Sequence, residues 1–495
     1  ICHNLLFIFI AFCSKMDNCT FVGRKVFMKK TKIICSIGPA TNTKEVFKEL
    51  VHAGMNVARV NFSHATIEER ETVRDLVAWI NEEENANIGL LYDTKGPEFR
   101  NGEVVEGGIN LVPGNTIRVV KESVIGNDER FSVNHPEALD SLNVGSVIQL
   151  ENGLMKIEVI SKETDGVTCK VINGGNLGSK KSLFVPGVKL DIPFISDVDR
   201  EDIIYACKNN GDFLALSFVS TKEDVLEARE ILKEQNSNMK IIAKIESKTG
   251  IDNLDEILEV SDGVMVARGD LGEEVPISLL PVYQKRIVRK AREHGKFCIV
   301  ATEMLESMKK NSRPTRAEVT DVANAVLDGT DAVMLSGETT VGAYPVETVT
   351  YMASIASDAE VHSENHFGYL GKIGRTECIA KSAVDLTNYV DVKAIVAEAI
   401  SGYSTRMISN FRPKCPILAT CTTPEVARSL ALNYGVYTTL VPLMDDTDEL
   451  VDLVRDKAIE YFDLKNDDKI IITGGLPAIN DVRLTNFLKI EEINK

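Results

Sequence analysis

From residue 32 onward, the chain alternates short, almost wholly apolar runs with stretches in which apolar residues recur every three or four positions. Runs without polar alternation are typical of strands buried on both faces, and the recurring pattern is typical of amphipathic helices. Eight such runs occur at 32–37, 55–60, 88–92, 213–218, 240–245, 263–266, 297–301 and 332–335. Eight β/α units in order predict a (β/α)₈ barrel of the TIM type.

A long stretch of different character separates the third of these runs from the fourth. Residues 97–190 are rich in Val, Thr, Gly and Asn, with short alternating segments at 116–120 and 156–160. Alternation between frequent turn residues is typical of β-structure. The sequence therefore predicts a small β-barrel lid domain inserted into the large catalytic barrel, which would occupy 28–96 and 191–360.

Strand and helix patterns begin again after residue 360. Apolar runs occur at 394–396, 417–420, 436–440 and 469–472, and residues 486–490 have the pattern of an edge strand. This order predicts a C-terminal α/β domain over 361–495. The whole chain is thus expected to be an α/β protein.

The first 27 residues differ from the rest of the chain. Their apolar run, Leu5 to Phe12, is too short to span a bilayer, and no basic residues precede it as they would in a secretory signal. Met28 stands directly before the first predicted strand. We therefore interpret 1–27 as an extra segment, disordered or non-native.

Composition narrows the classes of function. The net charge of -17 argues against a general nucleic-acid binder, which would usually be basic. The ten cysteines form no Cys-x-x-Cys pair, so free thiols in a reducing cytoplasm are expected. We expect neither nucleic acid nor a membrane among the partners.

Polar residues follow the predicted strands where a barrel would gather them, because functional groups of (β/α)₈ barrels lie at the carboxyl ends of the strands. Such residues follow seven of the strands: Arg59, Asn61, Ser63, Asp93, Thr94, Ser217, Lys244, Glu246, Asp270, Thr302 and Glu338. One charged residue at a strand end is usually an ordinary surface charge. Convergence from seven strands instead predicts a single site.

The residue types indicate which ligands this site would hold. Glu246 and Asp270 supply the anionic oxygen atoms that Mg²⁺ prefers. Arg59 and Lys244 supply positive charge for a phosphate or carboxylate. The backbone N–H groups of Gly269 and Asp270 are candidates to hold an anion.

A second group offers mainly neutral oxygen atoms with one negative charge. It comprises Asn61, Ser63, Asp93 and Thr94. Such a set suits a monovalent cation, which does not need several carboxylates to neutralise it. His64, the next residue after Ser63, has no obvious acidic partner, so packing or a local hydrogen bond is favoured over catalysis.

Long motifs in this order resemble the pyruvate kinase family. They are TKIICSIGPAT at 31–41, GMNVARVNFSH at 54–64, DTKGPEFR at 93–100, KIESKTG at 244–250, GVMVARGDLGEE at 263–274, ATEMLESM at 301–308 and MLSGET at 334–339. The resemblance covers 28–495. It implies a glycolytic enzyme that converts phosphoenolpyruvate and ADP into pyruvate and ATP.

The resemblance also implies catalytic roles. Lys244 would stabilise the transferring phosphoryl group and the enolate oxygen, and Arg59 would hold the phosphate. Thr302 would lie where the enolate carbon takes its proton, as a positioning group for a water relay, since a hydroxyl alone is a weak acid. The residues implied to contact substrate are Arg59, Ser217, Lys244, Gly269, Asp270 and Thr302.

Cofactors and nucleotide contacts are implied in the same way. Mg²⁺ would bind Glu246 and Asp270, and a second Mg²⁺ would arrive with the nucleotide. The implied K⁺ site comprises Asn61, Ser63, Asp93 and Thr94, and Glu98 matches family members that need this ion. The implied nucleotide-binding residues are Asn61, His64, Arg100 and Lys181.

A loop in the C-terminal domain is a candidate effector site. Its residues are Ser401, Gly402, Tyr403, Ser404 and Thr405, which precede a predicted helix and so could cradle a phosphate. An ordinary capped helix start explains them equally well. By resemblance, a sugar phosphate or nucleotide effector would bind here, in a cytoplasmic homotetramer.

The chain departs from the family pattern at several positions. Asn152 follows Glu151 where two aspartates are usual, 182–184 reads Ser-Leu-Phe in place of Gly-Val-Asn, and Glu303 replaces Gln. The first two affect the expected nucleotide contacts of the lid. Two other functions stay open: a metal-dependent lyase or aldolase acting on a pyruvate enolate, and a catalytically silent metabolite-binding regulator.

Overall fold

The computed structural model describes residues 20–21, 24–25, 29–151, 153–188, 190–363, 369–475 and 485–494. Within the extra N-terminal segment, β1 (Thr20–Phe21) pairs antiparallel with β2 (Arg24–Lys25). The other residues of 1–27 lie outside the described residues, as does Asn152. The interpretation of this segment therefore stays a prediction.

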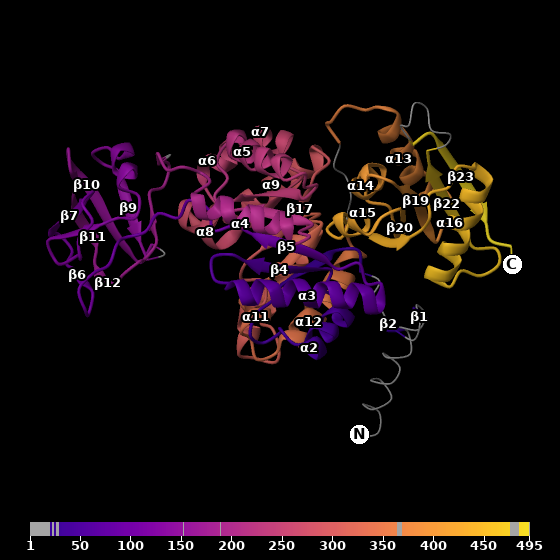
Figure 1. Cartoon of the computed structure of the whole chain (residues 1–495), viewed down its shortest axis with the longest axis horizontal. Coiled ribbons are helices and arrows are strands. Elements are labelled where there is room, and N and C mark those ends of the chain that lie inside the picture. The colour runs from indigo at the N-terminus through magenta and orange to yellow at the C-terminus, as the bar shows by residue number, and fades with distance from the viewer. Residues whose placement is uncertain are drawn as a thin grey trace, which may run out of the picture. The chain divides into compact units, whose positions relative to one another are not determined.

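Eight parallel strands close into the predicted barrel, in the order β14-β15-β16-β17-β18-β3-β4-β5. Their bounds are β3 (Lys32–Ser36), β4 (Val57–Asn61), β5 (Gly89–Asp93), β14 (Phe213–Leu216), β15 (Lys240–Ile245), β16 (Gly263–Ala267), β17 (Phe297–Ala301) and β18 (Ala332–Leu335). Of these strands, β4, β5 and β17 are labelled in Figure 1. Nearly every residue of these strands is buried, as expected when helices cover one face and side chains fill the other. All eight predicted strands are confirmed, with ends shifted by at most two residues.

Helices follow the strands in the predicted alternation. The main ones are α2 (Lys44–Ala53), α3 (Ile67–Glu84), α4 (Asp197–Lys208), α5 (Lys222–Glu234), α7 (Leu254–Val260), α9 (Leu280–Glu293), α10 (Arg316–Leu327) and α12 (Pro345–Glu360). Short helices α6 (Lys248–Asp252), α8 (Arg268–Glu274) and α11 (Gly337–Thr340) follow β15, β16 and β18. Local chemistry starts several of them: at α4, Ser196 and Asp199 form a capping box, which satisfies two backbone N–H groups.

The inserted β domain has a hydrophobic core of its own. One sheet has the order β13-β9-β10-β11-β7-β8, and β12 pairs with β6 in a second. The strands are β6 (Ile109–Leu111), β7 (Thr116–Val120), β8 (Arg130–Ser132), β9 (Val147–Leu150), β10 (Met155–Glu163), β11 (Gly166–Asn173), β12 (Gly175–Leu177) and β13 (Leu183–Phe184). The predicted insertion is confirmed as a curled sheet, without the closed ladder of the large barrel.

The predicted C-terminal α/β domain is also confirmed. Its sheet has the order β21-β20-β19-β22-β23, with β23 as an antiparallel edge strand. The elements are α13 (Arg375–Leu386), β19 (Ala394–Ala399), α14 (Tyr403–Asn410), β20 (Ile417–Cys421), α15 (Pro424–Ser429), β21 (Val436–Leu440), α16 (Thr447–Phe462), β22 (Lys469–Gly474) and β23 (Phe487–Glu492). Residues of β19 alternate between two apolar clusters, because the sheet is covered on both faces.

By its internal contacts the chain divides into two compact units. One comprises 1–58, 75–89 and 305–495, and the other comprises 59–74 and 90–304. The second unit holds every residue proposed for catalysis, metal and nucleotide binding. Among the described residues, no helix combines the length and apolar character needed to cross a bilayer. The exact domain boundaries given above stay predictions.

Candidate active site

Six neighbouring strands bring the candidate residues to one rim of the barrel, in the order β4-β5-β14-β15-β16-β17. Arg59 lies near the end of β4, Asp93 ends β5 and Ser217 follows β14. Lys244 lies in β15 one residue before its end. Because parallel strands share their carboxyl edge, residues far apart in sequence meet here.

Asp93 is the centre of this rim and is fully buried. Its Oδ2 accepts from Arg59, with Nε at 2.7 Å and a terminal nitrogen at 2.6 Å. Its Oδ1 accepts from Lys244 Nζ at 3.0 Å. Lys244 Nζ also donates to Ser217 Oγ at 2.6 Å, and Ser217 Oγ donates to the carbonyl of Thr94 at 2.7 Å. One carboxylate therefore orients both cations of the candidate site.

The electrostatics of this cluster keep its members charged. Burial alone would lower the pKa of Lys244, but the carboxylates of Asp93 and Glu246 more than offset it and hold the pKa above its usual range. Burial opposes ionisation of Asp93, yet Lys244 and Arg59 keep its pKa below the usual value. The charges compensate one another in a site that water barely reaches.

Glu246 is held beside this cluster with spare ligand capacity. Its Oε2 accepts from the backbone N–H of Phe218 at 2.6 Å. Its Oε1 is buried 3.2 Å from Lys244 Nζ but makes no hydrogen bond. Burial raises the pKa of Glu246 to about 7, and the nearby charge of Asp270 acts in the same direction. A cation between the two acids would relieve this repulsion.

The acidic pair fits the ligand habits of Mg²⁺. Mg²⁺ commonly takes one or two carboxylates and completes its shell with water and substrate oxygen atoms. Among the described residues, no group of three or more His, Cys, Asp or Glu side chains is placed to hold a metal ion. By ligand type, Glu246 and Asp270 suit an ion whose shell water and substrate oxygen atoms complete.

Thr302 and Gly269 meet across the ends of β16 and β17. Thr302 Oγ1 accepts from the N–H of Gly269 at 2.9 Å and donates to the carbonyl of Ala301 at 2.7 Å. The Gly269 N–H predicted to hold an anion is thus engaged by Thr302 in this structure. An incoming carboxylate would have to exchange with that hydroxyl.

The residues predicted for a monovalent cation are brought together in part. Asn61 Oδ1 accepts from the N–H of Ser63 at 3.1 Å, and Thr94 Oγ1 accepts from the N–H of Ser217 at 3.2 Å. Asp93 lies in the same region but is already shared by two protein cations. The set fits a monovalent ion by ligand type.

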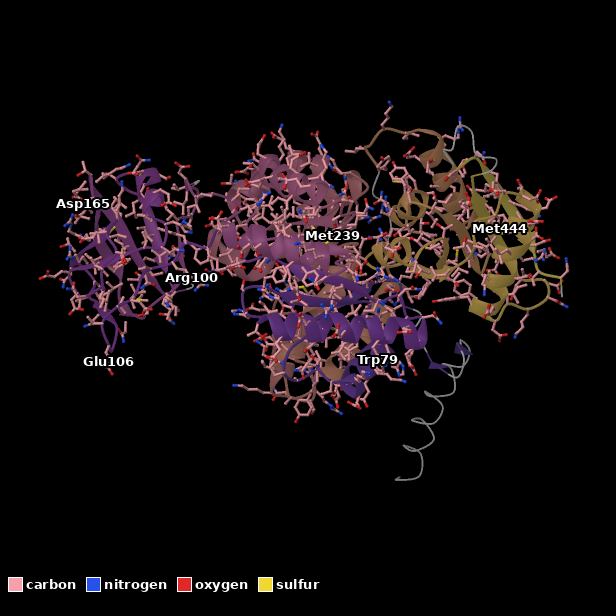
Figure 2. All side chains as sticks on the ribbon, viewed as in Figure 1. Trp79, Arg100, Glu106, Asp165, Met239 and Met444 are labelled. Atoms are coloured by element: carbon pink, nitrogen blue, oxygen red, sulfur yellow. The ribbon has the colours of Figure 1, made fainter. Side chains whose placement is uncertain are left out.

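The predicted nucleotide residues are more dispersed. The side chain of His64 is exposed, and the expectation of packing or a local hydrogen bond for it stays a prediction. Arg100, labelled in Figure 2, donates to Glu98 Oε2 and to the carbonyl of Lys180, both at 2.8 Å. Lys181 Nζ lies 2.7 Å from Glu151 Oε1.

A cavity of about 370 Å³ adjoins Asp270 within the same compact unit. The two chain segments that lead into and out of the inserted domain line it, together with loops of the barrel rim. Arg100 lies on its wall, as does Phe184, one of the departures from the family pattern. Phe184 therefore adds an aromatic surface where the family pattern has an amide.

The candidate effector loop belongs to the other compact unit. Gly402 has a φ of 75°, a left-handed conformation that glycine adopts without strain, and it precedes α14. Tyr403 donates its hydroxyl to Glu377 Oε1 at 2.5 Å. Ser404 and Thr405 lie in the first turn of α14, and the Thr405 side chain is buried. Both the phosphate cradle and the simple helix start remain compatible with this geometry.

Two residues of the site were missed by sequence reasoning. Phe218 contributes its N–H to Glu246 because its φ of 59° turns the backbone inward, and nothing in its identity signals this. Arg268 donates to the carbonyl oxygens of Ala301 and Thr302. Its place directly after β16 was the available signal.

Glu338, in the other unit, accepts from backbone N–H groups of Leu305 and Ser336 and so stabilises loops.

Comparisons with known proteins show which sequences and structures this chain resembles. The family model described as pyruvate kinase, barrel domain, matches residues 28–349, and that of the pyruvate kinase alpha/beta domain matches 377–491. The chain is 43% identical over 476 residues to a pyruvate kinase of Bacillus licheniformis, covering 94% of this chain and 80% of the relative. It is 42% identical over 475 residues to one of Geobacillus stearothermophilus, covering 94% and 81%. The crystal structure of a pyruvate kinase from Cryptosporidium parvum superposes with a TM-score of 0.89 at 37% identity, covering 94% of this chain and 96% of that one.

Proposed function

The chain belongs to the pyruvate kinase family, and from this premise we propose that the rim around Asp93, Lys244, Glu246 and Asp270 carries the family's reaction. The enzyme transfers the phosphoryl group of phosphoenolpyruvate to ADP, giving pyruvate and ATP in glycolysis. One observation carries the assignment of the site. The buried Lys244 is held by the carboxylate of Asp93, and beside it the carboxylate of Glu246 has one oxygen that makes no hydrogen bond.

Lys244 and Arg59 would handle the charge that moves during transfer. The bond between phosphorus and the enol oxygen breaks while a bond to the β-phosphate of ADP forms, so negative charge develops on the enolate oxygen. Lys244 would stabilise that oxygen and the phosphoryl group, and Arg59 would hold the phosphate. Asp93 would keep both cations charged and aimed, and Ser217 would fix the lysine from a second side.

Protonation of the enolate would involve Thr302. The N–H groups of Gly269 and Asp270 would hold the substrate carboxylate, and Thr302 would release the Gly269 N–H on binding. The freed hydroxyl would then order the water that delivers a proton to the enolate carbon. This exchange would couple binding of the carboxylate to readiness for proton transfer.

Two cations are part of the proposal. Mg²⁺ held by Glu246 and Asp270 would supply positive charge to the oxygen atoms of the substrate carboxylate and phosphoryl group. K⁺ would bind at Asn61, Ser63, Asp93 and Thr94. The donor types support both assignments, as the spare oxygen of Glu246 does for Mg²⁺.

Partners are proposed from the same resemblance. ADP and ATP would contact Asn61, His64, Arg100 and Lys181, of which His64 is exposed and available. A sugar phosphate or nucleotide would bind at 401–405, in a homotetramer. A cytoplasmic location is supported by the seven described cysteines, all of which are free thiols.

One assay tests the proposal against its alternatives. Pyruvate formation from phosphoenolpyruvate is measured with and without ADP, Mg²⁺ and K⁺, and we expect turnover only with ADP and Mg²⁺, increased by K⁺. Pyruvate formed without ADP would instead indicate lyase-type chemistry on an enolate. No turnover, with phosphoenolpyruvate still bound, would indicate a silent regulator.

A further inference from the structure

The turn that follows β17 has an uncommon backbone conformation. Thr302 and Glu303 have φ values of 68° and 53°. Both lie in the left-handed region, where a β-branched residue such as threonine is a genuine outlier. Such a conformation persists only where surrounding contacts impose it.

The side chain of Arg268 makes contacts of the kind required. Its Nε lies 3.2 Å from the carbonyl oxygens of both Ala301 and Thr302, and a terminal nitrogen lies 2.6 Å from the Thr302 oxygen. The same nitrogen is 3.0 Å from Met304 Sδ. A guanidinium is planar and permanently charged, so it can donate to neighbouring carbonyls simultaneously in a fixed geometry.

The backbone of this turn decides where the hydroxyl of Thr302 lies. That hydroxyl accepts from the N–H of Gly269, the residue directly after Arg268. The segment after β16 therefore holds Thr302 by two contacts. The Arg268 side chain donates to the Thr302 carbonyl, and the Gly269 N–H donates to the Thr302 hydroxyl. A rotation of the turn would move the hydroxyl away from both Gly269 and the reacting carbon.

We propose that Arg268 is a positioning residue for the protonation step, which holds Thr302 in its left-handed conformation and so places its hydroxyl. The inference rests on the proposed function and deepens it, since the mechanism above gives Arg268 no role. Arg268 acts through Thr302 rather than on the substrate.

The test replaces Arg268 by Met in the full-length enzyme. We expect kcat for pyruvate formation to fall about 10²-fold, because small misplacements of a reacting group have effects of this order, while KM for ADP changes less than about twofold. Exchange of the methyl protons of pyruvate with solvent deuterium, followed by NMR with Mg²⁺ and K⁺, should fall in parallel. This exchange reports proton transfer without phosphoryl transfer.

The matched control is Arg229→Met. Arg229 donates to the carbonyl of Val260 at 2.7 Å and to Asp262 at 3.0 Å, at the opposite end of β16. The Arg229→Met substitution removes a comparable contact to a backbone carbonyl, but away from the site. Both kcat and the rate of methyl exchange should therefore stay within about twofold of wild type. If Arg268→Met does not yield folded protein, Arg268→Lys is measured by the same criteria.

A double-mutant cycle separates positioning from general support. In a Thr302→Ala background, Arg268→Met should slow methyl exchange by less than about threefold, because the group it positions is absent. An undiminished loss in that background overturns the inference, and so does an Arg268→Met enzyme as active as Arg229→Met. If wild type itself forms no pyruvate from phosphoenolpyruvate and ADP, the proposed function fails first.

Discussion

Two buried lysines on barrel strands, one in each compact unit, have pKa values that are shifted in opposite directions. Lys244 in β15 and Lys32 in β3 are both shielded from water. The pKa of Lys244 is raised, whereas burial lowers the pKa of Lys32 to about 7, with the charge of Lys29 acting in the same direction. Burial penalises the ammonium in both places, so the difference comes from the neighbours.

Carboxylates dominate the charged surroundings of Lys244, whereas Lys32 faces the positive charge of Lys29, and the carboxylate of Glu360 offsets the effect of burial only in part. Lys32 Nζ donates to the carbonyl of Val436 and lies 4.6 Å from the centre of the Tyr437 ring. A carbonyl dipole and an aromatic face attract a cation less strongly than the ion pairs of Lys244. A permanently charged lysine suits phosphoryl transfer, while a neutral one serves packing.

The compact unit that contains Lys32 also holds a buried ion pair, between Arg412 and Asp331. Arg412 lies 2.7 Å from Asp331 Oδ1, with both side chains almost fully buried, and donates to the carbonyl of Gly329 at 2.6 Å. The face of Tyr434 lies 4.1 Å from the guanidinium carbon. This ion pair joins the loop before β18 to the segment after α14, so its role is structural. Similar chemistry is thus proposed to serve catalysis in one unit, whereas in the other it serves stability.

Removing the lysine of the active site should have the largest effect. We expect Lys244→Met to reduce kcat by about 10³-fold or more, because transition-state charge loses its main stabilising cation. The coupled assay for pyruvate measures it. Lys233→Met, which alters a largely exposed lysine of α5, is the control and should match wild type. A kcat for Lys244→Met within about tenfold of wild type would remove this lysine from the mechanism.

Breaking the structural ion pair should act on stability instead. Arg412→Met removes the ion pair of the buried Asp331 and should lower the free energy of unfolding by about 3–5 kcal/mol, with kcat of the folded enzyme changed less than about twofold. Urea unfolding and the coupled assay measure the two quantities. The exposed pair Arg118–Asp165 is the control, where Arg118→Met should cost no more than about 1 kcal/mol. An equal loss of unfolding free energy for Arg412→Met and Arg118→Met would contradict the structural role of the buried ion pair.

The most gradual expected effect, small for each pH unit, is a pH dependence of stability from Lys32. The unfolded chain keeps this lysine protonated up to its ordinary pKa of 10.5, whereas the folded chain releases the proton near pH 7. Between these values the unfolded state binds more protons, so folding becomes more favourable as pH rises. Relative to Lys32→Met, wild type should gain up to about 1.4 kcal/mol per pH unit in this window.

Urea unfolding of both proteins at several pH values above neutrality checks this slope. Lys29, whose pKa burial lowers to about 8, is present in both and largely cancels in the difference. The exposed Lys310 serves as control, since Lys310→Met should show no such slope. A stability difference that stays constant with pH would mean that Lys32 remains charged in the folded protein.

Much of the architecture was accessible from local pattern. The eight apolar runs predicted β3 to β5 and β14 to β18 of the barrel because strands buried on both faces have little polar alternation. The position of Lys244, Glu246, Asp270 and Thr302 just at or after strand ends then placed them at one rim. The succession of strands and the polar residues at their carboxyl ends can be read from the sequence, so these predictions needed no knowledge of contacts between distant residues.

The pairing of charges across the rim depended on tertiary structure. Sequence reasoning assigned Asp93 to a cation site, and only the fold shows that it holds Arg59 and Lys244 at once. Sequence reasoning likewise could not reveal the left-handed backbone at Thr302 or the hydrogen bonds that Arg268 donates to that turn. Periodicity reports which face a residue occupies, but hydrogen bonds between distant residues depend on strand register and loop conformation, which arise only when the barrel closes.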